Sequence, residues 1–364
     1  MFRPKRSSLV KRLWKHRVRP QHHEAGSEVE SAEELELKSA GQSLLKRLKE
    51  ADLEALLAAV ETRGAESTPC VWLSRAVLQL GKRKAMPHTL SCQLWRWSDL
   101  DTNCEVMRHL PCKSGEVDAN SVCCNPFHWS RVLPPGTPPR ASRQLFPHSA
   151  FPPLITQHLT SPATKHNALY APEYSPMSLH HSMVSYDQPR DDHSRVCWCH
   201  VAYWEHRSRV GRLFAVYDAS VHIFQHLPQG DGMCLDLLQA PSSEDSVRRT
   251  RDKIGVGLVL DMQDGAVWAH NRSDFPIFVN SPTLDIPGSP ALIVKKVPPG
   301  HTIKIHDRRV SKVIERHRDA AFLEGPFDPY AVRISFAKGW GPHYSRQFIT
   351  SCPCWVEILL TGNR

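Results

Sequence analysis

The sequence predicts an α+β N-terminal domain, a Pro-rich linker, and a C-terminal antiparallel β-sandwich with flanking helices and loops. Three observations support this prediction. Leucines recur every three or four residues between residues 37 and 60, prolines and histidines crowd residues 134–195, and short runs of alternating apolar residues dominate residues 196–364. The 364 residues suffice for two domains of ordinary size and a linker.

Four segments follow from these changes in composition. Residues 1–30 are predicted to be a basic disordered arm, 31–133 the α+β domain, 134–195 a flexible linker, and 196–364 the sandwich. The first 20 residues hold eight Lys or Arg and no acid, so they account for most of the net charge of +9. Such runs are usually solvated, although nuclear import and attraction to nucleic acid are functional alternatives.

The N-terminal domain is predicted to begin with two amphipathic helices. Ser31 precedes two acids, which is typical of a helix start. The apolar positions recur at helical spacing with a break expected near Ala51-Asp52, and we assign them to the core: Leu44, Leu45, Leu48, Leu53, Leu56, Leu57 and Val60.

In the C-terminal segment, apolar residues alternate in short runs, which predicts strands. Examples are Val210–Val216, Val332–Phe336 and Val356–Ile358, and Asp264-Gly265 is a typical hairpin turn. One helix is expected over Ser243–Ile254, with Ser242 or Ser243 as its N-cap.

Several classes of protein are not expected. No apolar run approaches the roughly 20 residues of a membrane span, and the N-terminus lacks the apolar core of a signal peptide. We therefore expect no membrane insertion and no secretion, and we predict a protein of the nucleus and cytoplasm. The GxSxG, HExxH and Walker motifs are missing, so an enzyme is not expected.

The 11 cysteines, several of them near a histidine, favour reduced thiols and metal over disulfides. Cys112, Cys123 and His128 form Cys-x₁₀-Cys-x₄-His, and Cys70 lies far upstream. Three thiolates and one imidazole would close a tetrahedral shell around a structural Zn²⁺. From spacing alone, scattered buried thiols are an equal alternative, with three competing cysteines: Cys92, Cys104 and Cys124.

Several runs of the chain resemble the two Mad-homology domains of Smad proteins. CQLWRWSDL and VCCNPFHWSRV resemble the N-terminal domain, whereas VAYWEHRSRVGRLFAVYD and AKGWGPHYSRQFITSCPCW resemble the C-terminal one. The resemblance implies zinc ligands at Cys70, Cys112, Cys123 and His128, with Cys124 as a non-ligand. The last strand runs into Thr361-Gly-Asn-Arg364 rather than a Ser-x-Ser tail, so the resemblance is to the inhibitory branch.

Two basic segments of the sandwich form a candidate phosphate-reading surface. The predicted helix carries four cations, and the loop Lys338–Arg346 carries two more around Gly339-Trp340-Gly341. A solvated helix face is the alternative from the residues alone. The resemblance implies docking on a phosphorylated type I receptor kinase through Arg249, Lys253, Lys338 and Arg346, with Trp340 as an apolar anchor.

The resemblance also raises DNA binding, ubiquitin ligases and trimers. The stretch 71–91, where DNA-binding relatives carry a hairpin, is short and concentrates only Lys82, Arg83 and Lys84, which favours a solvated turn or weak phosphate-driven binding. The Pro-Pro-x-Tyr motif that recruits ubiquitin ligases in relatives is not found. A homotrimer is implied by the family. The pairs Cys197-x-Cys199 and Cys352-Pro-Cys354 are predicted core thiols.

Taken together, the sequence predicts an intracellular, non-enzymatic inhibitor of TGF-β- and BMP-type signalling. Its expected partners are phosphorylated type I receptors and activated Smads, mainly in the BMP arm. The alternative is a zinc-containing DNA-binding corepressor. Salt-dependent, sequence-selective DNA binding by residues 1–133 would distinguish the two.

Overall fold

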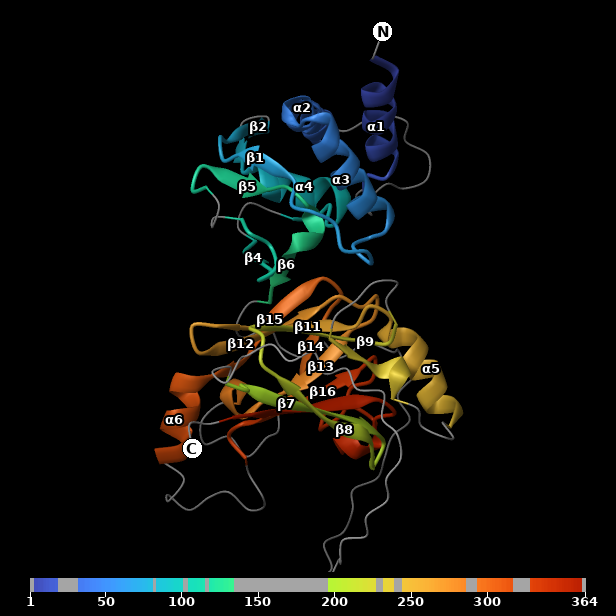
Figure 1. Cartoon of the computed structure of the whole chain (residues 1–364), viewed down its shortest axis with the longest axis vertical. Helices are drawn as coiled ribbons and strands as arrows, with labels where there is room; N and C mark the ends of the chain where they lie inside the picture. Colours follow the sequence, from blue (N-terminus) through green and yellow to red (C-terminus); the bar gives the residue numbers. More distant parts are fainter. Residues whose placement is uncertain are drawn as a thin grey trace, which may run out of the picture. The chain divides into compact units, whose positions relative to one another are not determined.

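A computed structural model describes residues 3–18, 32–80, 83–100, 104–114, 118–133, 196–226, 232–238, 244–285, 293–316 and 328–361 (Figure 1). Residues 1–140 and 196–364 belong to one compact unit. The predicted linker lies outside the described residues. None of the helices in the described part of the chain is long and apolar enough to cross a membrane.

The N-terminal domain is built from four helices and short strands. The helices are α1 (Arg3–Lys15), α2 (Ala32–Arg47), α3 (Glu50–Glu61) and α4 (Pro87–Trp95). The strands and the 3₁₀ turn are β1 (Trp72–Ser74), β2 (Leu78–Leu80), β3 (Arg83–Ala85), β4 (Val106–Arg108), β5 (Ser121–Cys123), η1 (Pro126–His128) and β6 (Trp129–Val132). The predicted leucines are buried as expected, but the break between α2 and α3 falls at Leu48-Lys49, earlier than Ala51-Asp52.

The prediction of a disordered arm is wrong for Arg3–Lys15, which forms α1. Leu9 and Leu13 of α1 are buried in the N-terminal core. Arg6 donates hydrogen bonds to the carbonyls of Leu45 and Leu48, both at 2.9 Å, and so caps the end of α2. Glutamates of α3 pair with other cations of α1, and the arm is therefore an amphipathic helix whose charge is partly neutralised.

The C-terminal domain contains two packed sheets, as Figure 1 shows. The first has the order β14-β13-β16-β17-β7-β8 and is antiparallel throughout. Its strands are β7 (Cys199–Glu205), β8 (Ser208–Val216), β13 (Ile277–Asn280), β14 (Lys295–Val297), β16 (Ala331–Phe336) and β17 (Trp355–Leu360).

The second sheet has the order β10-β9-β11-β12-β15-β6-β4. Its strands from this domain are β9 (Ser220–Phe224), β10 (Met233–Cys234), β11 (Leu258–Gln263), β12 (Ala266–Asn271) and β15 (His301–Asp307). The β11–β12 turn is the predicted Asp264-Gly265 pair, and both residues have positive φ, as a tight hairpin requires. The sheet is not purely antiparallel, because β10 pairs in parallel with β9, and β6 with β15.

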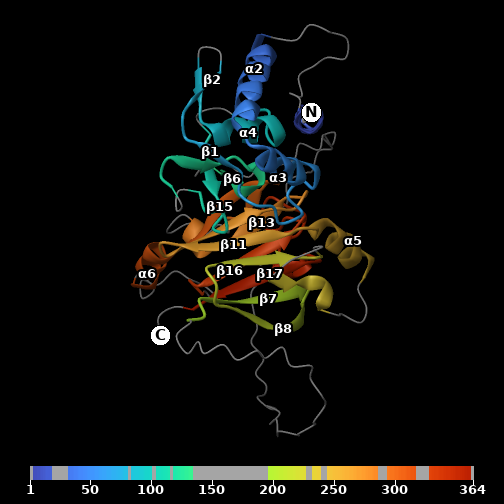
Figure 2. The same cartoon turned by 45° about the horizontal axis from the view of Figure 1, so that its top comes forward.

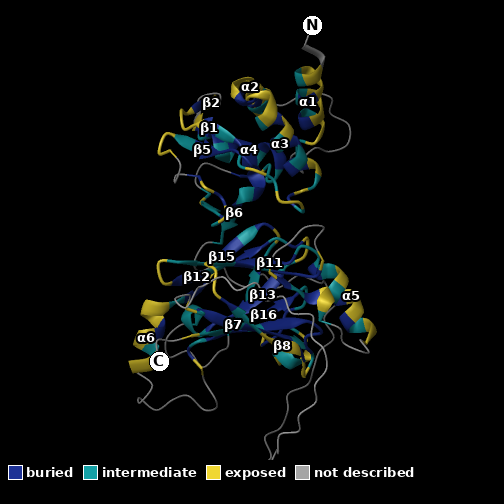
Figure 3. Cartoon of the chain, viewed as in Figure 1, coloured by how far each residue is buried: buried dark blue, intermediate teal, exposed yellow. Residues whose placement is uncertain are grey.

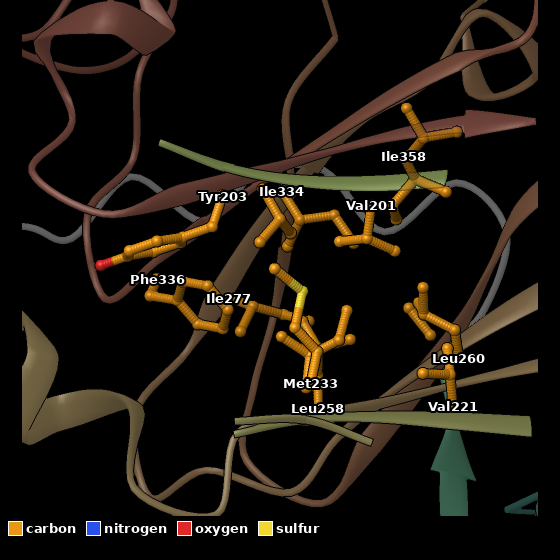
Figure 4. Packing of buried hydrophobic residues seen from close by; sticks show 14 of the residues in the cluster. Val201, Tyr203, Val221, Met233, Leu258, Leu260, Ile277, Ile334, Phe336 and Ile358 are labelled. Atoms are coloured by element: carbon orange, nitrogen blue, oxygen red, sulfur yellow. The ribbon is translucent and has the colours of Figure 1, made fainter. Parts of the chain in front are cut away.

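The core of this domain lies between the two sheets. Figure 4 shows Val201, Ile334 and Ile358 of the first sheet facing Val221 and Leu260 of the second. All five are at most 5% exposed. Removing such apolar surface from water is the main stabilisation of the sandwich.

Two helices flank the sheets, α5 (Asp245–Ile254) and α6 (Arg308–Arg316), and Figure 2 shows them at opposite ends of the sandwich. Helix α5 confirms the predicted helix, but its N-cap is Glu244 rather than a serine. Helix α6 was not predicted. Figure 3 shows exposed residues along both helices, in contrast to the buried strands.

Strand β8 is the last strand of the first sheet, so no other strand in the described part of the chain pairs with one side of its backbone. The ladder between β7 and β8 is irregular between the pairs Val201–Phe214 and Tyr203–Val210, where one residue of β7 lies opposite three of β8. Arg209 and Arg212 of β8 are both exposed.

Candidate metal cluster and phosphate-binding surface

The four predicted metal ligands converge in the N-terminal domain. Cys70 precedes β1, Cys112 follows β4, Cys123 ends β5, and His128 ends η1. Their ligand atoms all lie within 4.8 Å of one another. Pairing of β1 with β5 places Trp72 opposite Cys123, which brings the most distant segment, around Cys70, to the other three.

Three separations within this cluster match the edges of a tetrahedral zinc site. Cys70 Sγ lies 3.8 Å from Cys112 Sγ and 3.6 Å from His128 Nδ1, and Cys123 Sγ lies 3.4 Å from the same nitrogen. Metal–ligand bonds of about 2.3 Å to sulfur and about 2.0 Å to nitrogen give tetrahedral edges of about 3.8 and 3.5 Å. The cluster is therefore consistent with a zinc site.

Neighbouring groups fix the orientation of the ligands. His128 Nε2 lies 3.1 Å from the carbonyl oxygen of Thr68, so the Nε2–H tautomer donates there and leaves Nδ1 free for a metal. Asn125 donates its backbone N–H to Cys123 Sγ at 3.4 Å and accepts a hydrogen bond from Phe127 N. This second shell of hydrogen bonds is typical of structural metal sites.

The pKa values within the cluster diverge because three thiols crowd one another. Hydrogen bonds from Cys112 and Cys123 lower the pKa of Cys70, while the pKa of Cys112 rises to about 11. A divalent metal ion would displace the remaining protons. The competing cysteines lie elsewhere, since Cys92 and Cys124 are fully buried in the apolar core.

The two basic segments of the C-terminal domain also come together. Helix α5 contributes Arg249 and Lys253, and the loop after β16 contributes Lys338 and Arg346; we call these four residues the four-cation surface. Burial lowers the pKa of Lys338, and the charges of Lys253, Arg346 and Arg249 lower it further, so these three cations lie within electrostatic range of Lys338. Within the described residues, none of the four side chains has an ion-pair partner.

The other two cations of α5 are neutralised. Arg248 pairs with Asp245 one turn earlier. Arg251 donates from Nε to Glu205 at 2.6 Å, and Tyr203 donates its hydroxyl to the same carboxylate at 2.9 Å. Glu205 is only 8% exposed, so this ion pair fastens α5 to β7. Among the residues that the structure describes, Arg249 and Lys253 remain the cations of the helix without an ion-pair partner.

The prediction that Trp340 is an apolar anchor on the binding surface is wrong. Trp340 is 2% exposed and packs in a small cluster with Phe278, Cys352 and Trp355. Trp340 therefore supports the loop from within, and it is not an exposed anchor. Gly339 is required next to it, because a Cβ there would lie 2.5 Å from the ring of Tyr344.

The remaining predicted sites are only partly described. Strands β2 and β3 form a short antiparallel hairpin in stretch 71–91, where DNA-binding relatives carry one. Lys84 is exposed, Lys82 lies outside the described residues, and of Arg83 only the backbone is described. Cys199, Cys352 and Cys354 are fully buried, which confirms them as core thiols, whereas Cys197 is half-buried.

Comparison with known proteins identifies both domains. The MH1 domain model matches residues 37–133 and the MH2 domain model matches residues 196–361. "Mothers against decapentaplegic homolog 6" of Gallus gallus is 49% identical over 91% of this chain and 76% of its own length. The chain belongs to the inhibitory Smad family. "Mothers against decapentaplegic homolog 7" is 39% identical in Mus musculus, over 93% of this chain and 81% of its own length.

The human homolog 7 is 38% identical over 90% of this chain and 79% of its own length. Inhibitory Smads antagonise TGF-β- and BMP-type signalling as adaptors rather than enzymes, which confirms the function predicted from sequence. The matches do not favour the corepressor alternative. Smads in general interact with receptors and with other Smads.

Proposed function

We propose that this inhibitory Smad blocks signal relay by occupying a phosphorylated type I receptor kinase, mainly in the BMP arm, through its four-cation surface. The proposal is carried by the gathering of Lys253, Arg249 and Arg346 around Lys338, with no ion-pair partner for any of the four among the described residues. Hydrogen bonds join the two elements through the segment around Phe275, from Ser273 Oγ to Lys253 O and from Ala337 N to Pro276 O. Like charges held together repel one another, and a bound phosphate relieves that repulsion. Arg binds phosphate in bidentate fashion and Lys acts as a point charge.

A phosphorylated segment of an activated Smad is a second candidate occupant, because it offers the same phosphate chemistry. Either occupant would be withheld from the productive signalling complex. Measuring the affinity of the full chain for the receptor kinase and for the Smad segment, each in phosphorylated and unphosphorylated form, shows which of the two it prefers.

The test is binding of the full chain to a phosphorylated and an unphosphorylated type I receptor kinase domain, measured by calorimetry. We expect Lys338→Ala and Arg346→Ala each to weaken binding of the phosphorylated form roughly 10- to 100-fold, because each removes a charge-assisted hydrogen bond. Arg248→Ala is the matched control, since Arg248 is already paired with Asp245 on the same helix. Equal binding of both kinase forms, or unchanged affinity in both variants, would overturn the proposal.

For the metal cluster we propose structural Zn²⁺ bound by Cys70, Cys112, Cys123 and His128. The tetrahedral separations and the second shell around His128 support zinc, and four protein ligands leave no position for a catalytic water. When bound, the ion would cross-link the segments before β1, after β4 and at the end of β5. We also propose, from the sequence alone, that the protein is present in both nucleus and cytoplasm.

A further inference from the structure

Phe275 is an exposed aromatic residue beside the four-cation surface. Its side chain is 40% exposed, and Lys253 Nζ lies 5.2 Å from the centre of its ring. A single exposed aromatic is ordinary on a protein surface. Its place next to one of the four cations, and the way it is held there, make it informative.

Hydrogen bonds fasten the Phe275 loop to α5. Asn271 is fully buried, donates from Nδ2 to Phe275 O at 2.9 Å, and accepts from Ser273 N at 3.1 Å. Ser273 Oγ donates to Lys253 O at 2.9 Å and accepts from Phe275 N at 3.0 Å. Both the N–H and the carbonyl oxygen of Phe275 are thus hydrogen-bonded. Ser273 links Phe275 to Lys253 in the last turn of α5.

The same loop is tied to the second basic element. Ala337 donates its N–H to Pro276 O at 3.0 Å, and Ala337 immediately precedes Lys338. The segment of residues 273–276, which contains Phe275, is therefore hydrogen-bonded at one end to α5 and at the other end to the loop that carries Lys338.

We propose that Phe275 is the apolar contact of the four-cation surface, and that the surface prefers phosphorylated peptides with an apolar side chain beside the phosphate. This inference rests on the proposed binding of phosphate by the four cations. Cations alone would accept most phosphorylated segments, whereas a rigid aromatic adds selectivity at little cost in conformational entropy. Phe275 would fill the role that the sequence suggested for Trp340.

The test uses the full chain and a set of phosphoserine peptides in a polar background, in which one leucine is moved through the positions flanking the phosphoserine. A peptide without leucine is the reference. We expect the best leucine peptide to bind the wild type roughly 5- to 10-fold tighter than the reference, from burial of the leucine against the ring. Phe275→Ala should remove that gain, so that the variant binds the leucine peptide and the reference equally well, while Phe275→Leu restores part of the difference.

Leu213→Ala on β8 is the matched control, because Leu213 is 43% exposed on a different element. If Phe275→Ala and Leu213→Ala behave alike, or if leucine has no effect at any position, the role of Phe275 is refuted while phosphate binding stands. If the wild type does not distinguish phosphorylated from unphosphorylated peptide, the proposed function itself fails.

Discussion

The metal cluster and the four-cation surface use the same number of side chains in opposite ways. In the cluster, Cys112 and Cys123 are almost fully buried and the four ligand atoms face one another. On the four-cation surface, Arg249 is exposed and the other three are half-buried, and burial together with the neighbouring cations lowers the pKa of Lys338. The first arrangement contributes to folding once a metal is bound. The four-cation surface lowers the stability of the fold through repulsion between like charges, and this repulsion favours binding of an anion.

The largest expected effect on stability is loss of the metal. Zinc should co-purify at one equivalent, and Cys123→Ser should release it. The N-terminal domain should then melt roughly 40 °C lower or fail to fold, because a structural Zn²⁺ contributes on the order of 10 kcal/mol to folding and each kcal/mol shifts a domain of about 100 residues by roughly 4–8 °C. Scanning calorimetry and metal analysis of the full chain measure both quantities.

Cys104→Ser is the control for this change, since Cys104 is half-buried and is not part of the cluster. It should retain zinc. If metal-free Cys123→Ser melts at the same temperature as the wild type, the cluster does not stabilise the domain by binding a metal. It would then be only a group of buried thiols, and its contrast with the four-cation surface would fail.

An intermediate effect is expected at Trp340. Trp340→Ala should lower the free energy of unfolding by about 3–5 kcal/mol, as large-to-small changes in a core do, and should also weaken receptor binding by loosening the loop that carries Lys338. Urea denaturation and calorimetry give the two values. If Trp340→Ala keeps the stability of the wild type but loses receptor binding, Trp340 contacts the receptor directly. That result would contradict a role that depends on its burial.

The smallest expected effect on stability lies at Lys338. Lys338→Met keeps the length of the side chain and removes one of four like charges, so the free energy of unfolding should stay within about 0.5 kcal/mol of the wild type or rise slightly. Receptor affinity should nevertheless fall. A clear loss of stability would show that Lys338 has a structural partner and would remove the contrast between the two sites.

How far the sequence predicted these sites depends on what each site requires. A metal cluster needs cysteine and histidine ligands, and the pattern Cys-x₁₀-Cys-x₄-His already indicated three of the four candidate ligands. In α5, Arg249 and Lys253 stand four residues apart and so share a face, which is also readable from sequence. That Arg251 is neutralised could not be read, because its partner Glu205 lies on a distant strand.

The errors arose where tertiary packing decides exposure. Trp340 and Phe275 both stand beside glycine, proline or charged residues, and local sequence does not tell which ring is buried. Helix α1 was missed because its charges dominated its composition, while Leu9 and Leu13, four residues apart, carry its contact with the core. In each case the deciding partner is remote in the chain.

The β8 edge of the first sheet has a consequence for association between copies of the chain. An unpaired strand is a template on which another extended chain can add, and it invites association between copies. Arg209 and Arg212 place two exposed positive charges on β8, and a second copy would bring two more to the same edge. Because like charges close together across a sheet are destabilising, these arginines oppose edge-to-edge association through β8.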